Sequence, residues 1–136
     1  MQNIRKILLI LLIIPLIAIV GYYALIFLLG GPALPNFFEL TNHDVRTHEI
    51  SVEILDSDNE SVFKESYKLH PNESVSKEKP SNLRSSFESK EYTFRIILDN
   101  GSAEETTSVS LNRWSTATIH LYWDHETPII IGEIVV

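Results

Sequence analysis

The hydrophobic pattern divides the chain into two parts with different periods. Residues 7–29 read ILLILLIIPLIAIVGYYALIFLL, a run of 23 without a charged side chain. At about 1.5 Å per residue, a helix of this length spans roughly 35 Å, enough to cross the ~30 Å hydrocarbon core of a bilayer. After residue 36, apolar and polar residues alternate with period two, which is typical of half-buried strands. The pattern therefore predicts a transmembrane helix followed by an all-β domain.

The alternation assigns side chains to the two faces of each predicted strand. In the run 48–55, His48 shares one face with Ile50, and in the run 117–124, Leu121 and Trp123 share a face opposite His120. Turns rich in Asp, Asn, Pro and Gly separate the runs. Seven or eight short strands at this spacing, with no amphipathic helix among them, predict an antiparallel β-sandwich. The predicted strands are 37–41, 48–55, 62–69, 73–77, 91–98, 104–111, 117–124 and 128–136.

Four segments follow from this division. They are a short cytoplasmic N-terminus (1–6), a transmembrane helix acting as signal anchor (7–29), a Gly/Pro linker (30–36) and an extracytoplasmic β-sandwich domain (37–136). Arg5 and Lys6 precede the span, and the next basic residue is Arg46. The positive-inside rule therefore predicts a single-pass protein of the cell membrane with its C-terminal domain outside the cytoplasm.

A cleaved signal peptide is the alternative to an anchor. Its apolar region is typically about 7–15 residues long and ends at a small-x-small cleavage site. Here the apolar run is longer and is followed by GGPALPN, which contains no Ala-x-Ala. These two features favour an uncleaved anchor.

Charge and cysteine content exclude several classes of protein. Residues 7–136 hold nine of the 11 basic residues and all 18 acidic ones, so their net charge is 9 − 18 = −9. Binding to nucleic acid or to an anionic lipid surface requires a basic face, and this balance argues against both. The chain has no cysteine, so neither disulfides nor thiolate chemistry contributes.

Several polar sites fall in predicted turns. The stretch DSDNES at residues 56–61 has the alternating oxygen ligands of a calcium loop, but Ser61 occupies the sixth position and Tyr67 the twelfth. A calcium hand requires glycine and glutamate there, so we interpret the stretch as a hairpin turn. Asn59, Asn72 and Asn100 each begin an Asn-x-Ser sequon, and we predict possible glycosylation at these turns.

The histidines are the candidates for a metal site. Copper or zinc needs three or four converging nitrogen and oxygen ligands. The alternative hypothesis is therefore a metal site, while His48 on the apolar face is expected to be a satisfied histidine at the edge of the core. Spacings match no metal motif, and no catalytic constellation is recognisable, so neither a cofactor nor an enzymatic activity is predicted. The provisional ligands are His43, Asp44, His120, Asp124 and His125.

Two segments are candidates for contact with a protein partner. The terminal run PIIIGEIVV at residues 128–136 is apolar on both faces, which predicts either a strand buried between neighbours or a strand that packs on a partner. The first interpretation is favoured. The serine-rich connection at residues 76–90 is the second candidate surface.

The stretch TNHDVRTHEISVEILDSDNESVFKESYKLHPNES and the later EYTFRIILDNG resemble Ig-like β-sandwich domains of archaeal surface and membrane-anchored proteins. The resemblance covers most of residues 41–123 and departs at Asn59 and Asn72, where such domains usually have glycine. It implies an Ig-like fold outside the cytoplasm with a binding or structural role, and it implies no catalytic residues. The predicted function is a non-enzymatic, membrane-anchored interaction or accessory module, such as a small subunit of a membrane or cell-surface complex, with a copper- or zinc-binding domain as the alternative.

Overall fold

The computed structural model describes all 136 residues, which form two compact units, Met1–Pro32 and Ala33–Val136. The first unit contains one helix, α1 (Gln2–Leu28), which has Pro15 in its interior and no buried residue. Proline is tolerated in such helices when its freed carbonyl finds another partner. The helix is long and apolar enough to cross a membrane.

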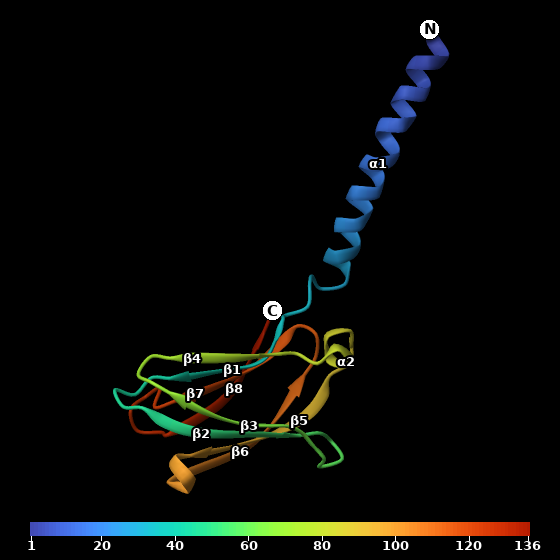
Figure 1. Ribbon diagram of the computed structural model, residues 1–136. Coiled ribbons are helices and arrows are strands. Elements are labelled where there is room, and N and C mark those ends of the chain that lie inside the picture. Colours follow the sequence, from blue (N-terminus) through green and yellow to red (C-terminus); the bar gives the residue numbers. More distant parts are fainter. The chain divides into compact units, whose positions relative to one another are not determined.

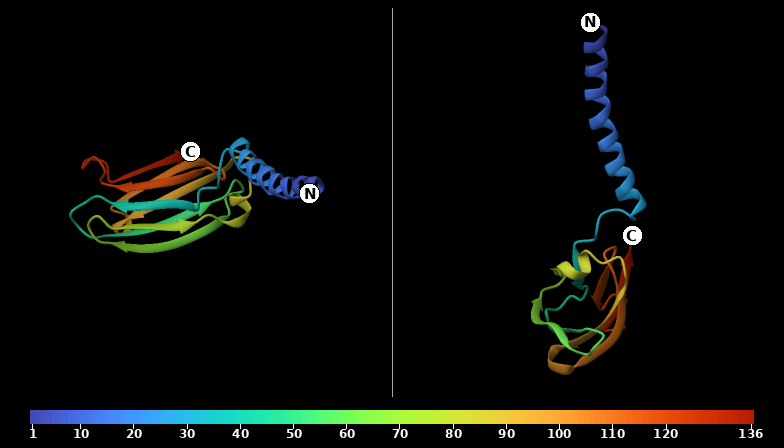
Figure 2. Two further views of the ribbon diagram at one scale, coloured as in Figure 1. Left: turned by 90° about the horizontal axis from the view of Figure 1, so that it is seen from above. Right: turned by 90° about the vertical axis from the view of Figure 1, so that its right-hand side faces the viewer.

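The second unit is a sandwich of two four-stranded sheets (Figures 1 and 2). One sheet has the order β4-β1-β7-β8, and the other has the order β3-β2-β5-β6. The prediction of a β-sandwich with about eight strands is therefore confirmed. The strands are β1 (Asn36–Asn42), β2 (His48–Leu55), β3 (Ser61–Leu69), β4 (Ser74–Glu78), β5 (Lys90–Leu98), β6 (Ala103–Leu111), β7 (Ser115–Leu121) and β8 (Ile129–Val135).

One pair of strands departs from the predicted antiparallel arrangement. β1 and β7 run parallel, in a register from Phe38 opposite Ala117 to Asn42 opposite Leu121. All other strand pairs are antiparallel. Alternation within a strand cannot reveal this neighbour, because parallel strands are joined by a long crossover and not by a local turn.

The core lies between the two sheets and follows the predicted alternation. Ile50, Val52 and Ile54 on β2 are almost completely buried, as are the inward residues of β5. Phe38 of β1 packs against the ring of Phe63 of β3, with ring centroids 5.5 Å apart. Burial of these apolar side chains from both sheets is the main stabilising term for a domain without disulfides.

The predicted inward position of Trp123 is wrong. β7 ends at Leu121, and Tyr122 has a left-handed backbone with φ of 53°. The left-handed residue interrupts the alternation of a strand, and Trp123 is 59% exposed.

The favoured interpretation of the C-terminal run is also wrong. β8 is the last strand of its sheet and pairs only with β7, so it is not buried between two neighbours. Ile134 and Val135 are 50% and 62% exposed. A strand that ends a sheet leaves one row of backbone N–H and C=O groups without a neighbouring strand.

The connection at 76–90 is more ordered than its serine-rich sequence indicates. It contains the end of β4 and a short helix, α2 (Ser81–Arg84). Leu83 of α2 is fully buried, and Lys79 is 1% exposed. This segment therefore contributes to the core as well as to the surface.

Candidate functional site

The acidic stretch at 56–61 forms the β2–β3 turn, as predicted. One carboxylate oxygen, Asp56 Oδ1, accepts hydrogen bonds from the backbone N–H groups of Asp58 and Glu60 at 2.9 and 3.0 Å. Asn59 completes the turn with φ of 59°. The carboxylate that would have begun a calcium loop is thus used to close the turn.

All three sequon asparagines occupy left-handed turn positions. Asn59, Asn72 and Asn100 have φ of 59°, 59° and 55°, and all three are exposed. Asparagine adopts this conformation more readily than most residues other than glycine, so these turns accommodate it. Their glycosylation remains a prediction.

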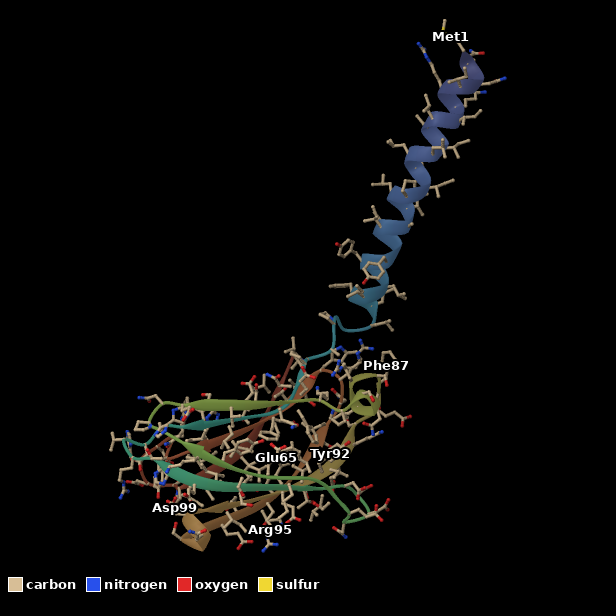
Figure 3. All side chains as sticks on the ribbon, viewed as in Figure 1. Met1, Glu65, Phe87, Tyr92, Arg95 and Asp99 are labelled. Carbon is tan, nitrogen blue, oxygen red and sulfur yellow. The ribbon has the colours of Figure 1, made fainter.

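Most of the histidines gather at one end of the sandwich. This end is formed by the loop after β1, the start of β2, the short helix η1 (Asp99–Gly101) and the loop after β7. Figure 3 shows Asp99 at this end and Phe87 at the opposite one. The parallel pairing of β1 with β7 places the two loops that follow these strands side by side.

His43 and His120 lie in direct contact at this end. Their Nε2 and Nδ1 atoms are 3.0 Å apart, so one ring donates a hydrogen bond to the other. The indole of Trp123 contacts both rings, with centroids 4.6 Å from His43 and 4.8 Å from His120. Burial, together with the neighbouring His43, lowers the pKa of His120.

His48 lies between two carboxylates, as a satisfied histidine at the edge of the core. Its Nδ1 is 2.6 Å from Asp99 Oδ2, and its Nε2 is 2.7 Å from Asp44 Oδ2. The ring is 4% exposed and stacks on Tyr122 at 5.2 Å. The prediction for this residue is confirmed.

The charges in this cluster shift the pKa of each member. Burial opposes a proton on His48, but Asp99 and Asp44 outweigh it and raise the pKa of the imidazole. The hydrogen bond with His48 lowers the pKa of Asp44. Burial acts to raise the pKa of Asp99, but hydrogen bonds from the N–H of Glu49 and from His48 outweigh it and lower the pKa. Two carboxylates thus flank an imidazole that holds its proton to a higher pH than an isolated histidine does.

The five provisional metal ligands do not converge. Asp44 is bound to His48, and Asp124 accepts hydrogen bonds from the N–H and hydroxyl groups of Thr127 at 2.7 and 3.0 Å. His125 lies exposed in the turn after β7, with φ of 64°. No group of three or more His, Asp or Glu side chains is placed to hold a metal ion. Of the five predicted ligands, only His43 and His120 have side chains in contact with each other.

A groove of the sandwich opens between the edge strands β3 and β4. It has a volume of about 650 Å³ and an aromatic lining from Phe37, Phe63 and Tyr92. Its rim carries basic and acidic side chains. The Nζ of Lys77 on this rim lies 5.2 Å from the centre of the Phe63 ring and donates a hydrogen bond to Glu65 Oε1 at 3.2 Å. This volume lies in the range of sites for small molecules or short peptide segments.

A buried lysine, Lys79, lies at the end of the sandwich opposite the histidines, close to α2. Lys79 extends its ammonium group under the β6–β7 turn, where Nζ donates to the carbonyls of Asn112, Arg113 and Ser115 at 2.9, 3.3 and 2.7 Å. Burial and the neighbouring Arg84 lower the pKa of this ammonium group. Nothing in the local sequence KEKP distinguishes Lys79 from its exposed neighbours, so sequence analysis missed it.

Comparison with known proteins gives the chain a family. No curated protein and no solved structure matched it. The family model described as halobacterial Ig-like domain matches residues 46–124, more than half of the chain. This interval runs from the loop before β2 to the loop after β7 and includes the whole of the β3-β2-β5-β6 sheet, with β4 and β7 of the other sheet. The match and the observed fold together show that the chain belongs to the halobacterial Ig-like domain family.

Proposed function

We propose that this protein is a single-pass membrane protein that presents a non-catalytic Ig-like domain outside the cytoplasm as an interaction or accessory module. The observation that carries the proposal is α1, which has 27 residues, none of them buried. An apolar helix without a protein partner is stable in a bilayer, where its side chains face acyl chains and its backbone groups are bonded internally.

The direction of insertion rests on charge. Arg5 and Lys6 flank the N-terminal end of the apolar segment, and the domain that follows has a net charge of −9 (9 − 18) over residues 7–136. Basic residues next to a span stay in the cytoplasm, whereas acidic domains have little influence on orientation. This asymmetry supports a cytoplasmic N-terminus and an extracytoplasmic sandwich.

Two surfaces are suited to a protein partner. β8 offers an open sheet edge with exposed Ile134 and Val135, to which an extended segment of a partner can add as a further strand. The 76–90 segment offers Phe87, which is 54% exposed. The polar groups at the histidine end mostly bond to one another, which favours a structural role for that end over catalysis.

Cell fractionation tests the anchor. The full chain with a C-terminal tag is expected to remain in the membrane pellet after alkaline carbonate washing. Ile13→Arg places a charge six residues inside the start of the apolar segment; an arginine at the centre of such a helix costs about 2.5–3.5 kcal/mol, and the variant is expected to move a fraction of the protein to the supernatant. Ile13→Leu is the matched control.

Protease treatment and intact mass test orientation and cleavage. Protease added to intact cells is expected to remove the tag and the sandwich and to leave only a short N-terminal fragment. A full-length protein in the carbonate supernatant would disprove the anchor. A mass that begins after residue 29 would show instead that the apolar segment is a cleaved signal peptide.

A further inference from the structure

A cluster of aromatic and cationic side chains, exposed at Phe87 and half-buried at Arg113 and Trp114, lies at the end of the sandwich opposite the histidines. The guanidinium carbon of Arg113 is 4.9 Å from the ring centre of Phe87 and 5.3 Å from that of Trp114. The two rings also contact each other, with centroids 5.8 Å apart. Phe87 is 54% exposed although it belongs to a packed cluster. In the following, these three residues are called the Arg113 cluster.

The two chain ends of the domain meet at this cluster. The N–H of Leu34, just before β1, donates to the carbonyl of Arg113 at 2.7 Å. The N–H of the C-terminal Val136 donates to the carbonyl of Trp114 at 3.2 Å, and Val136 is 79% exposed. The apolar surface therefore extends from Phe87 to the last residues of β8.

Charges of both signs are mixed at this end. Residues 78–88 together with Arg113 include three basic side chains and two acidic ones, and the β2–β3 turn at the same end adds Asp56, Asp58 and Glu60. Arg84 Nη2 lies 3.9 Å from Glu78 Oε2. The buried Nε of Arg113 has no hydrogen-bond partner. The end is thus aromatic with charges of both signs, which suits a zwitterionic headgroup region and not adsorption to an anionic surface.

The chain limits how far this end can lie from the membrane. Six residue steps separate Leu28, the last residue of α1, from Leu34, which is bonded to Arg113. An extended chain gains at most about 3.6 Å per residue, so six steps reach no further than about 22 Å. If Leu28 lies at the edge of the hydrocarbon core, a tether of this length keeps Arg113 within reach of the headgroups.

We propose that the Arg113 cluster docks on the lipid headgroup region of the bilayer that holds α1, with Phe87 and Trp114 at the water–lipid interface and the guanidinium of Arg113 beside lipid phosphates. The inference rests on the proposed function, because it requires α1 to be inserted. Tryptophan and arginine combine an apolar body with a polar or charged end, which suits them to this depth, and the apolar ring of Phe87 adds hydrophobic surface beside them. Docking fixes the domain against the membrane surface and directs the histidine end away from it.

The two tryptophans provide a reporter and its matched control. Trp123→Phe leaves Trp114 in the cluster, and Trp114→Phe leaves Trp123, which is 59% exposed at the opposite end. Each full-length variant is reconstituted into phosphatidylcholine vesicles, with or without bromine on the acyl chains close to the headgroups. Flotation with the vesicles is measured first, and tryptophan emission second.

Quenching by the brominated lipid is expected for Trp114 and not for Trp123. Phe87→Ser is expected to reduce the quenching of Trp114, because it removes the most exposed ring of the cluster. Val45→Ser, at an 83% exposed position of the loop between β1 and β2, is the control and is expected to leave the quenching unchanged.

A longer tether separates docking from mere proximity. With ten Gly and Ser residues inserted between Gly31 and Pro32, a docked cluster remains quenched, whereas a cluster held near the membrane only by its short linker loses the quenching. Unquenched Trp114 in protein that floats with the vesicles would overturn the docking and leave the anchor intact. Protein that fails to float would overturn both proposals. Quenching lost on insertion, or equal for both tryptophans, would also overturn the docking.

Discussion

At the scale of single residues, the pKa values of His48 and His120 are shifted in opposite directions. The pKa of His48 is raised above 6.5 by its two carboxylates, whereas the pKa of His120 is lowered below 6.5 by burial and by His43. Both shifts arise at the same end of the sandwich, from rings that differ only in their neighbours. An imidazole between carboxylates retains its proton, and an imidazole packed against another imidazole releases it.

The stability of the domain is therefore expected to decline on both sides of pH 6.5. The proton on His48 stabilises the folded state fully below pH 6.5, and this contribution is lost as the pH rises through the raised pKa. The lowered pKa of His120 means that the unfolded chain binds a proton more readily, so stability falls as the pH drops below 6.5. Asp44 and Asp99, with lowered pKa values, add a further loss below pH 3.8.

Two variants separate these contributions. Urea unfolding of the full chain in neutral detergent is followed between about pH 5 and 9. His48→Gln is expected to remove the decline at high pH and also to lower stability at pH 6, by about 1.5–3 kcal/mol for hydrogen bonds to charged groups. His120→Gln is expected to remove the decline between pH 6.5 and 5. Equal pH profiles for wild type and both variants would contradict the assignment, and the exposed His125→Gln is the control.

Sequence alone could predict the position of His48 but not its partners. Period-two alternation places it on the inward face of its strand, and such a position requires a hydrogen-bond partner. Asp99 is 51 residues away in the chain, and nothing local marks it as that partner. The inward position predicted for Trp123 is wrong for the same reason. The left-handed backbone of Tyr122, after which Trp123 is exposed, belongs to the β7–β8 turn and cannot be inferred from the strand pattern.

At the scale of elements, the β6–β7 turn depends on a side chain that follows the edge strand β4. Lys79 follows β4, and its ammonium group is the shared donor for three carbonyls of residues 112–115. Lys79→Met keeps the length of the side chain but removes this donor. The free energy of unfolding is expected to fall by about 1–3 kcal/mol, because buried carbonyls are left without a partner.

Lys77→Met is the matched control for this prediction. Lys77 also belongs to the β4 region, but its side chain is 43% exposed, and its ion pair with Glu65 is at the surface. Pairs of this kind contribute about 0–1 kcal/mol. Equal shifts of the urea midpoint for the two variants would show that the buried ammonium group does not support the turn.

The sequence predicts where strands occur better than it predicts how they are arranged. All eight predicted strands overlap observed ones, because alternation and turn residues are local. The parallel neighbours β1 and β7 and the edge position of β8 depend on the order of strands in the sheet, which period-two patterns do not encode. The two-sided apolar character of β8 suggested burial between strands, but in the folded domain much of it remains exposed.

At the scale of the whole molecule, charge and hydrophobicity are strongly segregated. The apolar residues 7–29 contain no charge. The net charge of 9 − 18 = −9 over residues 7–136 therefore belongs entirely to the part after residue 29. Such an excess keeps a domain soluble and opposes its compaction through mutual repulsion. Salt weakens this repulsion, since the screening length falls from about 10 Å at 0.1 M to about 3 Å at 1 M.

The stability of the sandwich is therefore expected to increase with sodium chloride concentration, by on the order of 1 kcal/mol between about 0.05 and 1 M. The measurement is the urea midpoint of the full chain at fixed pH. The double variant Glu105→Gln, Glu126→Gln changes two exposed positions and makes the net charge less negative, from −9 to −9 + 2 = −7. Its dependence on salt is expected to be weaker. A midpoint that does not change with salt would show that repulsion is negligible.

The parallel pairing of β1 with β7 has a mechanical consequence. Both strands run from the end where the chain enters the domain to the histidine end, so a pull between the start of β1 and the loop after β7 stretches them in opposite directions. The hydrogen bonds between them then carry the load together, in shear, and cannot be peeled apart one by one. A domain tethered through β1 and gripped at its far loops would resist tearing through the middle of its sheet, and its open edges would contribute little to that resistance.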